Sequence, residues 1–280
     1  MTRTPRTTPL TAQTPHDRRS LLRSAAGLGA CAALAPLLGG SLGGSLGTAA
    51  WAAGDDEDGD GRRQSPIDIR TDRVVLAPSA APLVVDYPDA VDLGLVYVNK
   101  DGEDGCEERA EDETVQAQDF SERAVVRRDG ETWRLLQTHF HITSEHRVDG
   151  RAFPMEQHFV HERASDGALL VVGVFLVPGG HGPQDRLLAD LPEECDDDPI
   201  RLRGINLSRM LPSSLSSWTY RGSLTTAPYT QGVTWHVMRQ PRAIEAGTIR
   251  RFRRLFEEGD SRGPQPLYGR SVRQVRGRRA

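Results

Sequence analysis

Three histidines with strand spacing are the residues of this sequence best suited to chemistry. His139 and His141 stand two apart, and His158 follows them after a short connection. Because side chains two apart in an extended strand point to the same face, His139 and His141 project together. If His158 lies on a neighbouring strand, three imidazoles converge and leave a fourth tetrahedral position open for water. That is the ligand set of a catalytic zinc site, whereas a structural zinc site is usually closed by a fourth protein ligand.

The neighbours of these histidines predict what supports them. Five of the eight histidines fall within 23 residues, and this clustering favours a metal site over separate packed side chains. Glu156 shares the strand face of His158, whereas His161 has the opposite parity and is expected to be a structural hydrogen-bonding residue. His146 follows Glu145 next to a turn, so we expect it to support a ligand rather than to bind the metal.

The rest of the chain has the pattern of a mainly β protein with short helices, an α+β fold. Strand-like runs occur at 83–85, 93–98, 124–128, 132–142, 158–162, 169–176 and 232–238. Apolar residues at helical spacing predict one helix over 246–256. Asp149-Gly150 is a turn signal that could bring the strands of His141 and His158 side by side. We expect a single domain over residues 62–270.

A different metal chemistry is open on the same residues. His139, His141 and Glu145 also resemble the first motif of the cupin barrels, in which the glutamate is itself a ligand and the metal is often iron or manganese. Gly150 follows Glu145 more closely than the cupin pattern requires, and the later histidines lie in no second cupin motif. The cupin alternative therefore rests on the first motif alone.

The first 52 residues predict an export signal that is removed. Arg18 and Arg19 precede a run rich in Leu, Ala and Gly that ends near Trp51 in a small-residue cleavage pattern, which is typical of the twin-arginine route. Pro36 and repeated glycines disfavour a membrane anchor, and the apolar run continues past Cys31, which disfavours lipidation there. We expect a protein that is secreted or lies in the periplasmic or cell-wall space.

The expected mature chain is acidic. Residues 1–52 hold five Arg and one Asp, so their removal lowers the formal net charge from −4 to −8. An acidic protein is a poor partner for nucleic acid, and after removal of the signal we expect no membrane association. We expect residues 53–61 to be an acidic flexible stub and residues 271–280 to be a frayed basic tail.

Segments in order along three quarters of the chain carry a family resemblance. They are Gln64-Ser-Pro-Ile-Asp68, residues 137–146, 154–161 and 171–176, residues 218–228 with 233–235, and Gln265-Pro-Leu267 with Arg270. Together they resemble an α-class carbonic anhydrase of the bacterial exported type. The resemblance implies a single domain on a large, twisted, mostly antiparallel central sheet, with a zinc site at the base of a cone. It implies a lyase that hydrates CO₂ reversibly to bicarbonate and a proton by attack of zinc-bound hydroxide.

The resemblance also implies a role for each site residue. Three residues would hold Zn²⁺: His139, His141 and His158. Thr225 and Glu145 would be catalytic: Thr225 would accept a hydrogen bond from the zinc-bound hydroxide, donate its own hydrogen bond to Glu145, and so orient the hydroxide. Three residues would support the metal ligands from behind: Gln137, Glu156 and His146. Six residues would line the CO₂ pocket: Val160, Val171, Leu224, Thr226, Val233 and Trp235. Sulfonamides and small anions would act as inhibitors.

The sequence departs from the family outside the zinc site. It lacks the aromatic-rich segment that usually precedes Gln64, and Ala227 replaces a usual proline. The disulfide of many secreted relatives has no counterpart; the resemblance instead places Cys106 and Cys195 near the rim of the cone, where we expect them to be bonded, with two unpaired thiols as the alternative. A relative that keeps the fold only to bind a partner is the alternative from another class. Such relatives usually lose a histidine ligand, and all three are present here.

The proton route differs from that of the fastest family members. Aligned with the family, Glu113 stands where many relatives have a histidine that carries the proton out. A carboxylate of pKa near 4.3 is a poor proton acceptor from a water of pKa about 7. We therefore expect turnover to be limited by proton transfer, to rise with added imidazole, and to gain from Glu113→His.

Overall fold

The computed structural model describes residues 61–98, 113–118, 120, 123–193 and 198–280. The chain divides into two units, 1–48 and 49–280, and every described residue belongs to the second. Its strands are β1 (Asp68–Ile69), β2 (Val75–Leu76), β3 (Leu83–Asp86), β4 (Val91–Val98), β5 (Thr114–Gln118), β6 (Val125–Arg128), β7 (Glu131–His141), β8 (Arg147–Val148), β9 (Arg151–Ala152), β10 (Met155–Arg163), β11 (Leu169–Gly179), β12 (Ile200–Ile205), β13 (Ser217–Ser223), β14 (Gln231–Met238), β15 (Arg242–Glu245), β16 (Arg273–Val275) and β17 (Gly277–Arg279). The described α-helices are α1 (Pro183–Leu187) and α2 (Ala246–Leu255), and 3₁₀ turns cover Thr71–Arg73 and Ser208–Met210.

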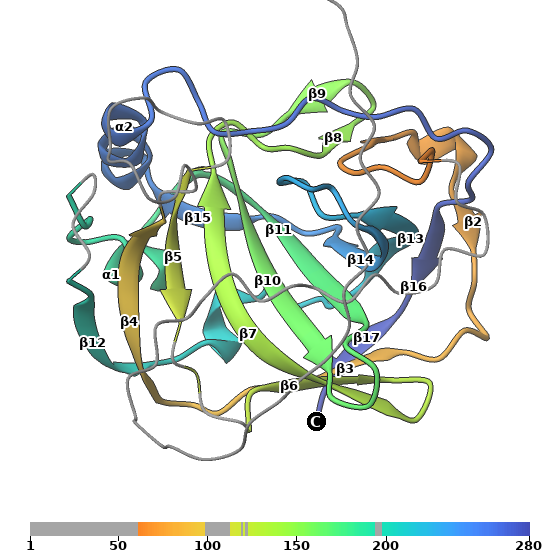
Figure 1. Ribbon diagram of the computed structural model, residues 1–280, viewed down its shortest axis with the longest axis horizontal. Helices are drawn as coiled ribbons and strands as arrows, with labels where there is room; N and C mark the ends of the chain where they lie inside the picture. Colours follow the sequence, from red (N-terminus) through yellow and green to blue (C-terminus); the bar gives the residue numbers. More distant parts are fainter. Residues whose placement is uncertain (1–60, 99–112, 119, 121–122, 194–197) are drawn as a thin grey trace, which may run out of the picture. The chain divides into compact units, whose positions relative to one another are not determined.

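One large sheet organises this unit. Its main path runs β12-β4-β5-β7-β10-β11-β14-β13-β16-β2, and Figure 1 shows β7, β10 and β11 side by side in its middle. Most neighbours are antiparallel, while β11 pairs with β14 and β15 in parallel. The predicted fold class, mainly β with short helices on a mostly antiparallel sheet, is confirmed. Helix α2 also ends within one residue of the predicted 246–256. Among the described residues, no helix has both the length and the hydropathy of a membrane span.

The two faces of β7 have different tasks. His139 and His141 point to one face, and Phe140 between them points to the other, where its ring lies 6.1 Å from that of Phe252 on α2. Phe140, Phe252 and Phe159 are fully buried. Burying aromatic side chains of this size is one of the largest stabilising contributions in a core. The alternation of β7 therefore fixes the histidines on a strand that is anchored from behind.

Asp149-Gly150 forms a turn, but not directly between the two histidine strands. Both residues have positive φ, 49° and 80°, as a tight two-residue hairpin turn requires. The turn closes the small hairpin of β8 and β9, which lies in the connection between β7 and β10. The two long strands then pair with each other in antiparallel register. The turn was predicted correctly, and the strands that it joins are shorter than expected.

The basic C-terminal residues are part of the sheet, so the prediction of a frayed tail over 271–280 was wrong. Strand β16 pairs with β13 and β2, and β17 pairs with β3. Val272 and Val275 are buried, while the Arg279 guanidinium donates to the carbonyl oxygens of Ser208 and Pro212. The error came from counting charges: alternate arginines occupy exposed sheet positions, and the backbone between them pairs normally.

His161 is the structural histidine that its parity predicted. It is fully buried. Its Nδ1 lies 3.1 Å from the carbonyl oxygen of Leu170, which can only accept, so Nε2 accepts the Tyr87 hydroxyl at 2.7 Å. Burial lowers the pKa of His161 from 6.5 to about 4. Folding therefore keeps this imidazole neutral at pH values where the unfolded chain would protonate it.

This pKa difference predicts a pH-dependent loss of stability. Between pH 6.5 and pH 4 the unfolded chain binds a proton at His161 that the folded chain does not, so stability is full above pH 6.5 and falls as the pH is lowered toward 4. From pH 7 to pH 5 this one residue should cost about 2 kcal/mol. In urea titrations, His161→Gln should lose about that much less than the wild type over this interval. His181→Gln, at an exposed histidine, is the control; equal losses in all three proteins would contradict the assignment.

Candidate metal centre

Three imidazole nitrogens meet over the middle of the sheet. Antiparallel pairing sets His158 of β10 directly opposite His139 of β7, and His141 lies two residues further along β7. One ligand nitrogen from each histidine lies within 4.8 Å of the other two. The side chains are 8%, 2% and 1% exposed for His139, His141 and His158. The structure thus brings together the three residues that spacing predicted, in a site closed off from most of the solvent.

Each ring is held from behind by an acceptor on its other nitrogen. Nδ1 of His139 lies 2.7 Å from Oε1 of Gln137, and Nδ1 of His141 lies 2.9 Å from the carbonyl oxygen of Asp260. Nε2 of His158 lies 3.0 Å from Oε1 of Glu156. Since these oxygens accept, each of these nitrogens carries the proton. The nitrogens left with a lone pair are Nε2 of His139, Nε2 of His141 and Nδ1 of His158.

These three nitrogens fit a metal ion better than they fit one another. Nδ1 of His158 and Nε2 of His139 face each other at 3.2 Å. The proton of each ring is on its other nitrogen, so neither of these two can donate to the other. Nε2 of His141 is buried and has no hydrogen-bond partner among the described residues. Buried polar atoms normally have a partner. Three imidazole nitrogens that converge in this way are a zinc ligand set with room for a fourth ligand.

Glu145 lies beside the nitrogens without joining them. Its Oε1 accepts the backbone N–H of Arg262 at 3.0 Å. Its Oε2 lies 3.6 Å from Nε2 of His141 and 3.8 Å from Nδ1 of His158, but stays outside the group of mutually close ligand atoms. Within the described part of the chain, Oε2 has no hydrogen-bond partner. The hydrogen bond expected from Thr225 is therefore not formed here; Thr225 itself is buried, just beyond the end of β13.

The carboxylates around the histidines set opposite pKa directions. Burial alone would raise the pKa of Glu156, but His146 and His158 hold it well below its usual value. Burial lowers the pKa of His158, and its carboxylate neighbours only partly offset this. Burial also lowers the pKa of His141, but Glu145 and Asp260 outweigh it, so the net shift is upward. For Asp260, burial raises the pKa to about 7. A divalent cation would add positive charge where buried carboxylates lack it.

His146 is linked to the ligand His158 through Glu156. The His146 backbone N–H donates to Oε2 of Glu156 at 2.9 Å, and its Nδ1 donates to Oε1 at 2.8 Å. Nε2 of His146 is 2.7 Å from the Tyr220 hydroxyl, which in turn donates to Oγ of Ser65 at 2.8 Å. A chain of buried hydrogen bonds thus links the ligand His158 to the start of the folded domain. Such outer partners commonly control metal affinity.

Glycine at position 173 makes room for this support. Gly173 lies opposite His158 in the β10–β11 register. A Cβ at this position would come within 2.8 Å of Oε1 of Glu156 and 3.7 Å of the His158 ring. Real side chains do not tolerate the first of these distances. The Glu156 carboxylate, which holds the ligand His158, therefore leaves room only for glycine at position 173.

The predicted apolar wall gathers at one end of the same face. A single cluster of buried side chains contains four of the six predicted residues: Val160, Val171, Val233 and Trp235. A fifth, Leu224, is partly buried and packs against this cluster. The Trp235 ring lies 4.9 Å from that of His158, and its Nε1 donates to the carbonyl oxygen of Ser223. Thr226 is half-buried next to Thr225. Strands β10, β11 and β14 thus supply apolar surface beside the metal ligands.

Other predictions have different outcomes. Glu113 is only 3% exposed, and its carboxylate accepts the Tyr97 hydroxyl. A proton carrier needs contact with solvent, so this placement argues against Glu113 as an exchange group. Cys106 and Cys195 lie outside the described residues, as does the predicted signal over 1–52, so their pairing and its removal stay predictions.

Sequence reasoning missed four residues that complete the centre. Tyr220 and Ser65 lie in segments that carried the family resemblance, but no pattern marked them as hydrogen-bonding residues. Asp260 and Arg262 lie more than 110 positions beyond the groups that they contact, His141 and Glu145. A backbone carbonyl and a backbone N–H make these two contacts, and backbone groups leave no signature in side-chain identity. Only the placement of chain segments in space reveals them.

A second cluster of possible ligands is satisfied without a metal. His181, Asp185 and Glu245 also bring their ligand atoms close together. Both oxygens of Asp185, however, already accept hydrogen bonds, from the N–H groups of Gly182 and Glu245 and from the Thr248 hydroxyl. Asp185 therefore caps α1 and fixes β15, and has no lone pair to spare for a cation. His181 is 70% exposed.

Comparison with known proteins agrees with this geometry. The sequence profile of the family described as eukaryotic-type carbonic anhydrase matches residues 46–276. The chain belongs to this family, the α-class carbonic anhydrases. Human carbonic anhydrase 7 is 36% identical over 251 residues, which cover 76% of this chain and 88% of the relative. The carbonic anhydrase of Nostoc sp. is 35% identical and covers 76% of this chain and 75% of the relative.

Solved structures of this family share the fold. The α-carbonic anhydrase of Thermovibrio ammonificans, in complex with sulfanilamide, superposes with a TM-score of 0.65 at 32% identity and covers 76% of this chain and 87% of that one. The Photobacterium profundum enzyme gives the same TM-score at 30% identity. The chain is thus a carbonic anhydrase, an enzyme of CO₂ hydration, and His139, His141 and His158 form its zinc site. The cupin alternative was wrong, because the sheet and the whole series of matching segments belong to another family.

The metal assignment predicts separate effects for ligands and neighbours. His139→Ala, His141→Ala and His158→Ala should each lose zinc, because two protein ligands cannot complete the site. Glu145→Gln should retain one zinc per chain, since Glu145 stays outside the ligand group. Metal content of the purified proteins by mass spectrometry checks both. Wild-type zinc content in the three alanine variants would refute the site, and zinc loss in Glu145→Gln would make Glu145 a ligand.

The space at position 173 predicts a weaker zinc site in Gly173→Ala. The added methyl must displace the Glu156 carboxylate, which then no longer holds the His158 ring, and losses of such support typically cost 10–100-fold in metal affinity. Competition with a chromogenic chelator measures the affinity. Gly180→Ala is the matched control, since a Cβ there meets nothing within 4 Å. Equal zinc affinity in both variants would show that the carboxylate tolerates displacement.

Proposed function

We propose that Glu145 and Thr225 are the catalytic residues of this carbonic anhydrase and that the protein is of the exported bacterial type. The observation that carries the first part is the unpartnered oxygen of Glu145. Its Oε2 is buried, is an acceptor, and lies within 4 Å of two metal-facing nitrogens. A buried carboxylate oxygen in such a place calls for a donor.

Thr225 is the donor that we assign to it. The residue is buried and follows β13 in a turn whose ends are tied by the bond from Leu224 N–H to the carbonyl oxygen of Thr230. The Arg262 N–H fixes the other oxygen of Glu145, so Oε2 keeps its direction. A hydroxyl that donates to Glu145 has only its lone pairs left for the reacting oxygen. Thr225 would then accept a hydrogen bond from the reacting hydroxide and hold that oxygen in one orientation, with a lone pair of the hydroxide oxygen directed at CO₂.

The metal supplies the acidity that these residues lack. When bound, zinc lowers the pKa of a coordinated water, and carbonic anhydrase is the established example, at about 7. The chain's own part is to hold that oxygen and to present CO₂. CO₂ has no dipole, so an apolar wall of Val160, Val171, Val233 and Trp235 suits it better than a polar one would.

Inhibition by sulfonamides belongs to the same proposal. The Thermovibrio relative, 32% identical, is described in complex with the inhibitor sulfanilamide. We expect sulfanilamide to bind this chain at its zinc site, and small anions to compete there. Gel filtration and native mass spectrometry with the inhibitor would measure the stoichiometry without any assay of turnover.

Export is supported by sequence alone. Paired arginines at 18 and 19 precede an apolar run that ends before residue 53, and the match to the family begins only at residue 46. A leader that ends near the start of the catalytic domain suits a signal that is removed. N-terminal sequencing of the protein recovered outside the cytoplasm would test this. A chain that starts at Met1 and stays in the cytoplasm would contradict it.

Thr225→Val should separate catalysis from metal binding. Valine has the shape of threonine without the hydroxyl, so we expect a normal zinc content and a fall in kcat/KM for CO₂ hydration of at least about 100-fold, the usual size of a positioned proton-transfer group. Thr225→Ser keeps the hydroxyl and should recover most of the rate. Stopped-flow hydration with a pH indicator measures both. A rate for Thr225→Val equal to that of the wild type would remove Thr225 from the mechanism.

A further inference from the structure

A hollow of about 390 Å³ is lined by the β8–β9 hairpin, by the residues that follow the hairpin and by one residue of β11. Figure 1 shows this hairpin at the top of the view. Most of the lining is apolar: Val148, Ala152, Phe153, Pro154 and Val177. Asp149 and Arg151 are the polar residues of the lining. Small-molecule sites are typically concave, mostly apolar and roughly 300–1,000 Å³ in volume, with a few polar groups that fix the ligand.

The hollow is distinct from the zinc site, although both use the same face of β11. Gly173 of β11 stands opposite His158, and Val177 lies four residues further along the strand. Four residues span about 13 Å of strand and return to the same face. Phe175 lies between these two positions and is only 1% exposed. This buried ring therefore separates the hollow from the metal ligands.

Phe153 gives the hollow a fixed aromatic wall. Its ring stacks on that of Phe175, with 4.0 Å between the ring centroids and 18° between the planes. The Phe153 backbone is held as well, because its N–H donates to Oγ of Ser144 at 2.8 Å and its carbonyl oxygen accepts the Ser144 N–H at 2.9 Å. Phe153 is half-buried and also lines the hollow. An aromatic ligand would meet a surface that is already ordered.

Arg151 stands on the side of the hairpin that faces the protein. Val148 and Arg151 are directly opposite each other in the β8–β9 pair, and such residues point to the same side. Val148 packs against the buried cluster that contains Phe175. Arg151 shares this side and lines the hollow, yet it is exposed to solvent. Its guanidinium makes no hydrogen bond or ion pair with any described residue.

Asp149, the acid in the lining, is already engaged elsewhere. Its two carboxylate oxygens accept the backbone N–H of Thr71 at 2.8 Å and the Thr71 hydroxyl at 2.6 Å. Arg70 lies 3.9 Å from the same carboxylate. The bonds from Thr71 lower the pKa of Asp149, so the group stays ionised and bound to them. Asp149 thus serves Thr71 and Arg70 and leaves the charge of Arg151 uncompensated.

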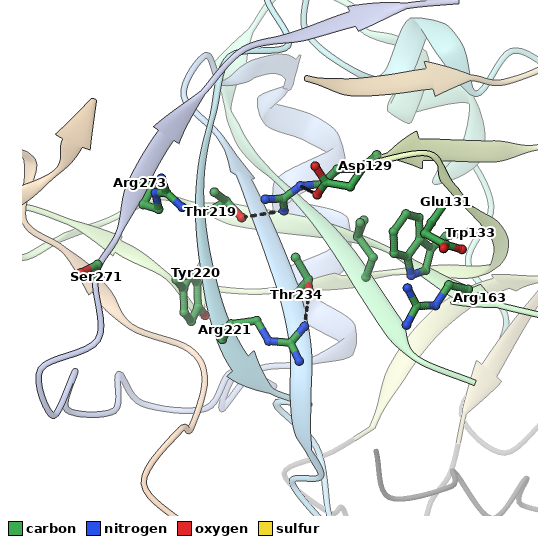
Figure 2. A pocket seen from close by; sticks show the side chains of 12 residues that line it. Asp129, Glu131, Trp133, Arg163, Thr219, Tyr220, Arg221, Thr234, Ser271 and Arg273 are labelled. Atoms are coloured by element: carbon green, nitrogen blue, oxygen red, sulfur yellow. Dashed lines mark hydrogen bonds and ion pairs between the residues drawn. The ribbon is translucent and has the colours of Figure 1, made fainter. Parts of the chain in front are cut away.

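Another hollow, of about 340 Å³, shows basic residues that do have internal partners. Arg128 there lies 3.1 Å from a carboxylate oxygen of Asp129. Arg221 donates to the Thr234 hydroxyl at 2.7 Å, as Figure 2 shows. Arg151 differs from these arginines because no described side chain offers it an acceptor. Its guanidinium is therefore available to an anion from outside the chain.

We propose that the hollow beside the β8–β9 hairpin binds a small aromatic carboxylate, with the ring beside Phe153 and the carboxylate on Arg151. A guanidinium and a carboxylate match as a two-pronged pair. One uncompensated cation suits a single negative charge, and the apolar lining suits a ring better than a polar ligand. The ligand fills the space between the hairpin and Val177 without reaching the metal.

Titration of the zinc-loaded protein, followed by NMR spectroscopy, tests this site with three probes. Benzoate should bind saturably, with one molecule per chain. Benzamide has the same shape without the charge, and acetate has the charge without the ring, so each should bind about fivefold more weakly or worse. Arg151→Gln should weaken benzoate binding by about fivefold, to the level of benzamide. Arg151→Lys should recover part of the loss, since it keeps the charge but not the fork.

The matched control is Arg147→Gln on the same hairpin. Arg147 is exposed and pairs with Ala152, but it does not line the hollow, so this variant should bind benzoate like the wild type. Arg151 has no side-chain partner among the described residues, and Arg151→Gln should therefore unfold at the wild-type temperature and keep its zinc. Absence of saturable benzoate binding would overturn the proposal. So would equal affinity for benzamide, or benzoate binding unchanged in Arg151→Gln, because the carboxylate would then lie at the metal or elsewhere.

Discussion

The antiparallel register of β7 with β10 is the constraint on which the rest of the centre depends. It sets His158 opposite His139 and Glu156 opposite His141. A shift by one residue would turn every side chain of one strand to the other face. The register is held by fully buried Phe140 and Phe159, which face away from the metal. These buried phenylalanines therefore fix the positions of the histidines on the opposite face of the strands, although neither ring faces the metal ligands.

Much of this centre could be predicted because it obeys the two-residue period of a strand. His139, His141 and His158 were readable from parity, and so was the structural part of His161. The C-terminal strands were not, since a run such as Arg273-Gln-Val-Arg276 looks like a charged tail until a neighbouring strand is known. Asp260 and Arg262 were hidden for a different reason. They act through backbone groups, and the sequence does not encode which distant strand those groups will meet.

The centre also shows how a protein can keep several carboxylates in its interior. Glu145, Glu156 and Asp260 are all nearly inaccessible. Each is tied to a donor: a backbone N–H holds Glu145 and Asp260, and two histidines hold Glu156. Burying charge without such partners would be costly. The negative charge of these carboxylates that remains uncompensated would stabilise a divalent cation bound between the neutral imidazoles.

Arg262 has a consequence for how the enzyme is made. Its backbone N–H donates to Glu145, while its guanidinium donates to Oε1 of Gln64 and to the carbonyl oxygen of Ser65 and lies 3.8 Å above the Tyr229 ring. Its partners Gln64 and Ser65 stand 198 and 197 positions earlier. The first and the last parts of the domain therefore meet at one residue. During synthesis, the three histidines emerge from the ribosome more than a hundred residues before Arg262 does. Contacts of such long range in sequence form slowly. All three metal ligands are therefore synthesised before Arg262, whose backbone N–H holds Glu145 in the catalytic site.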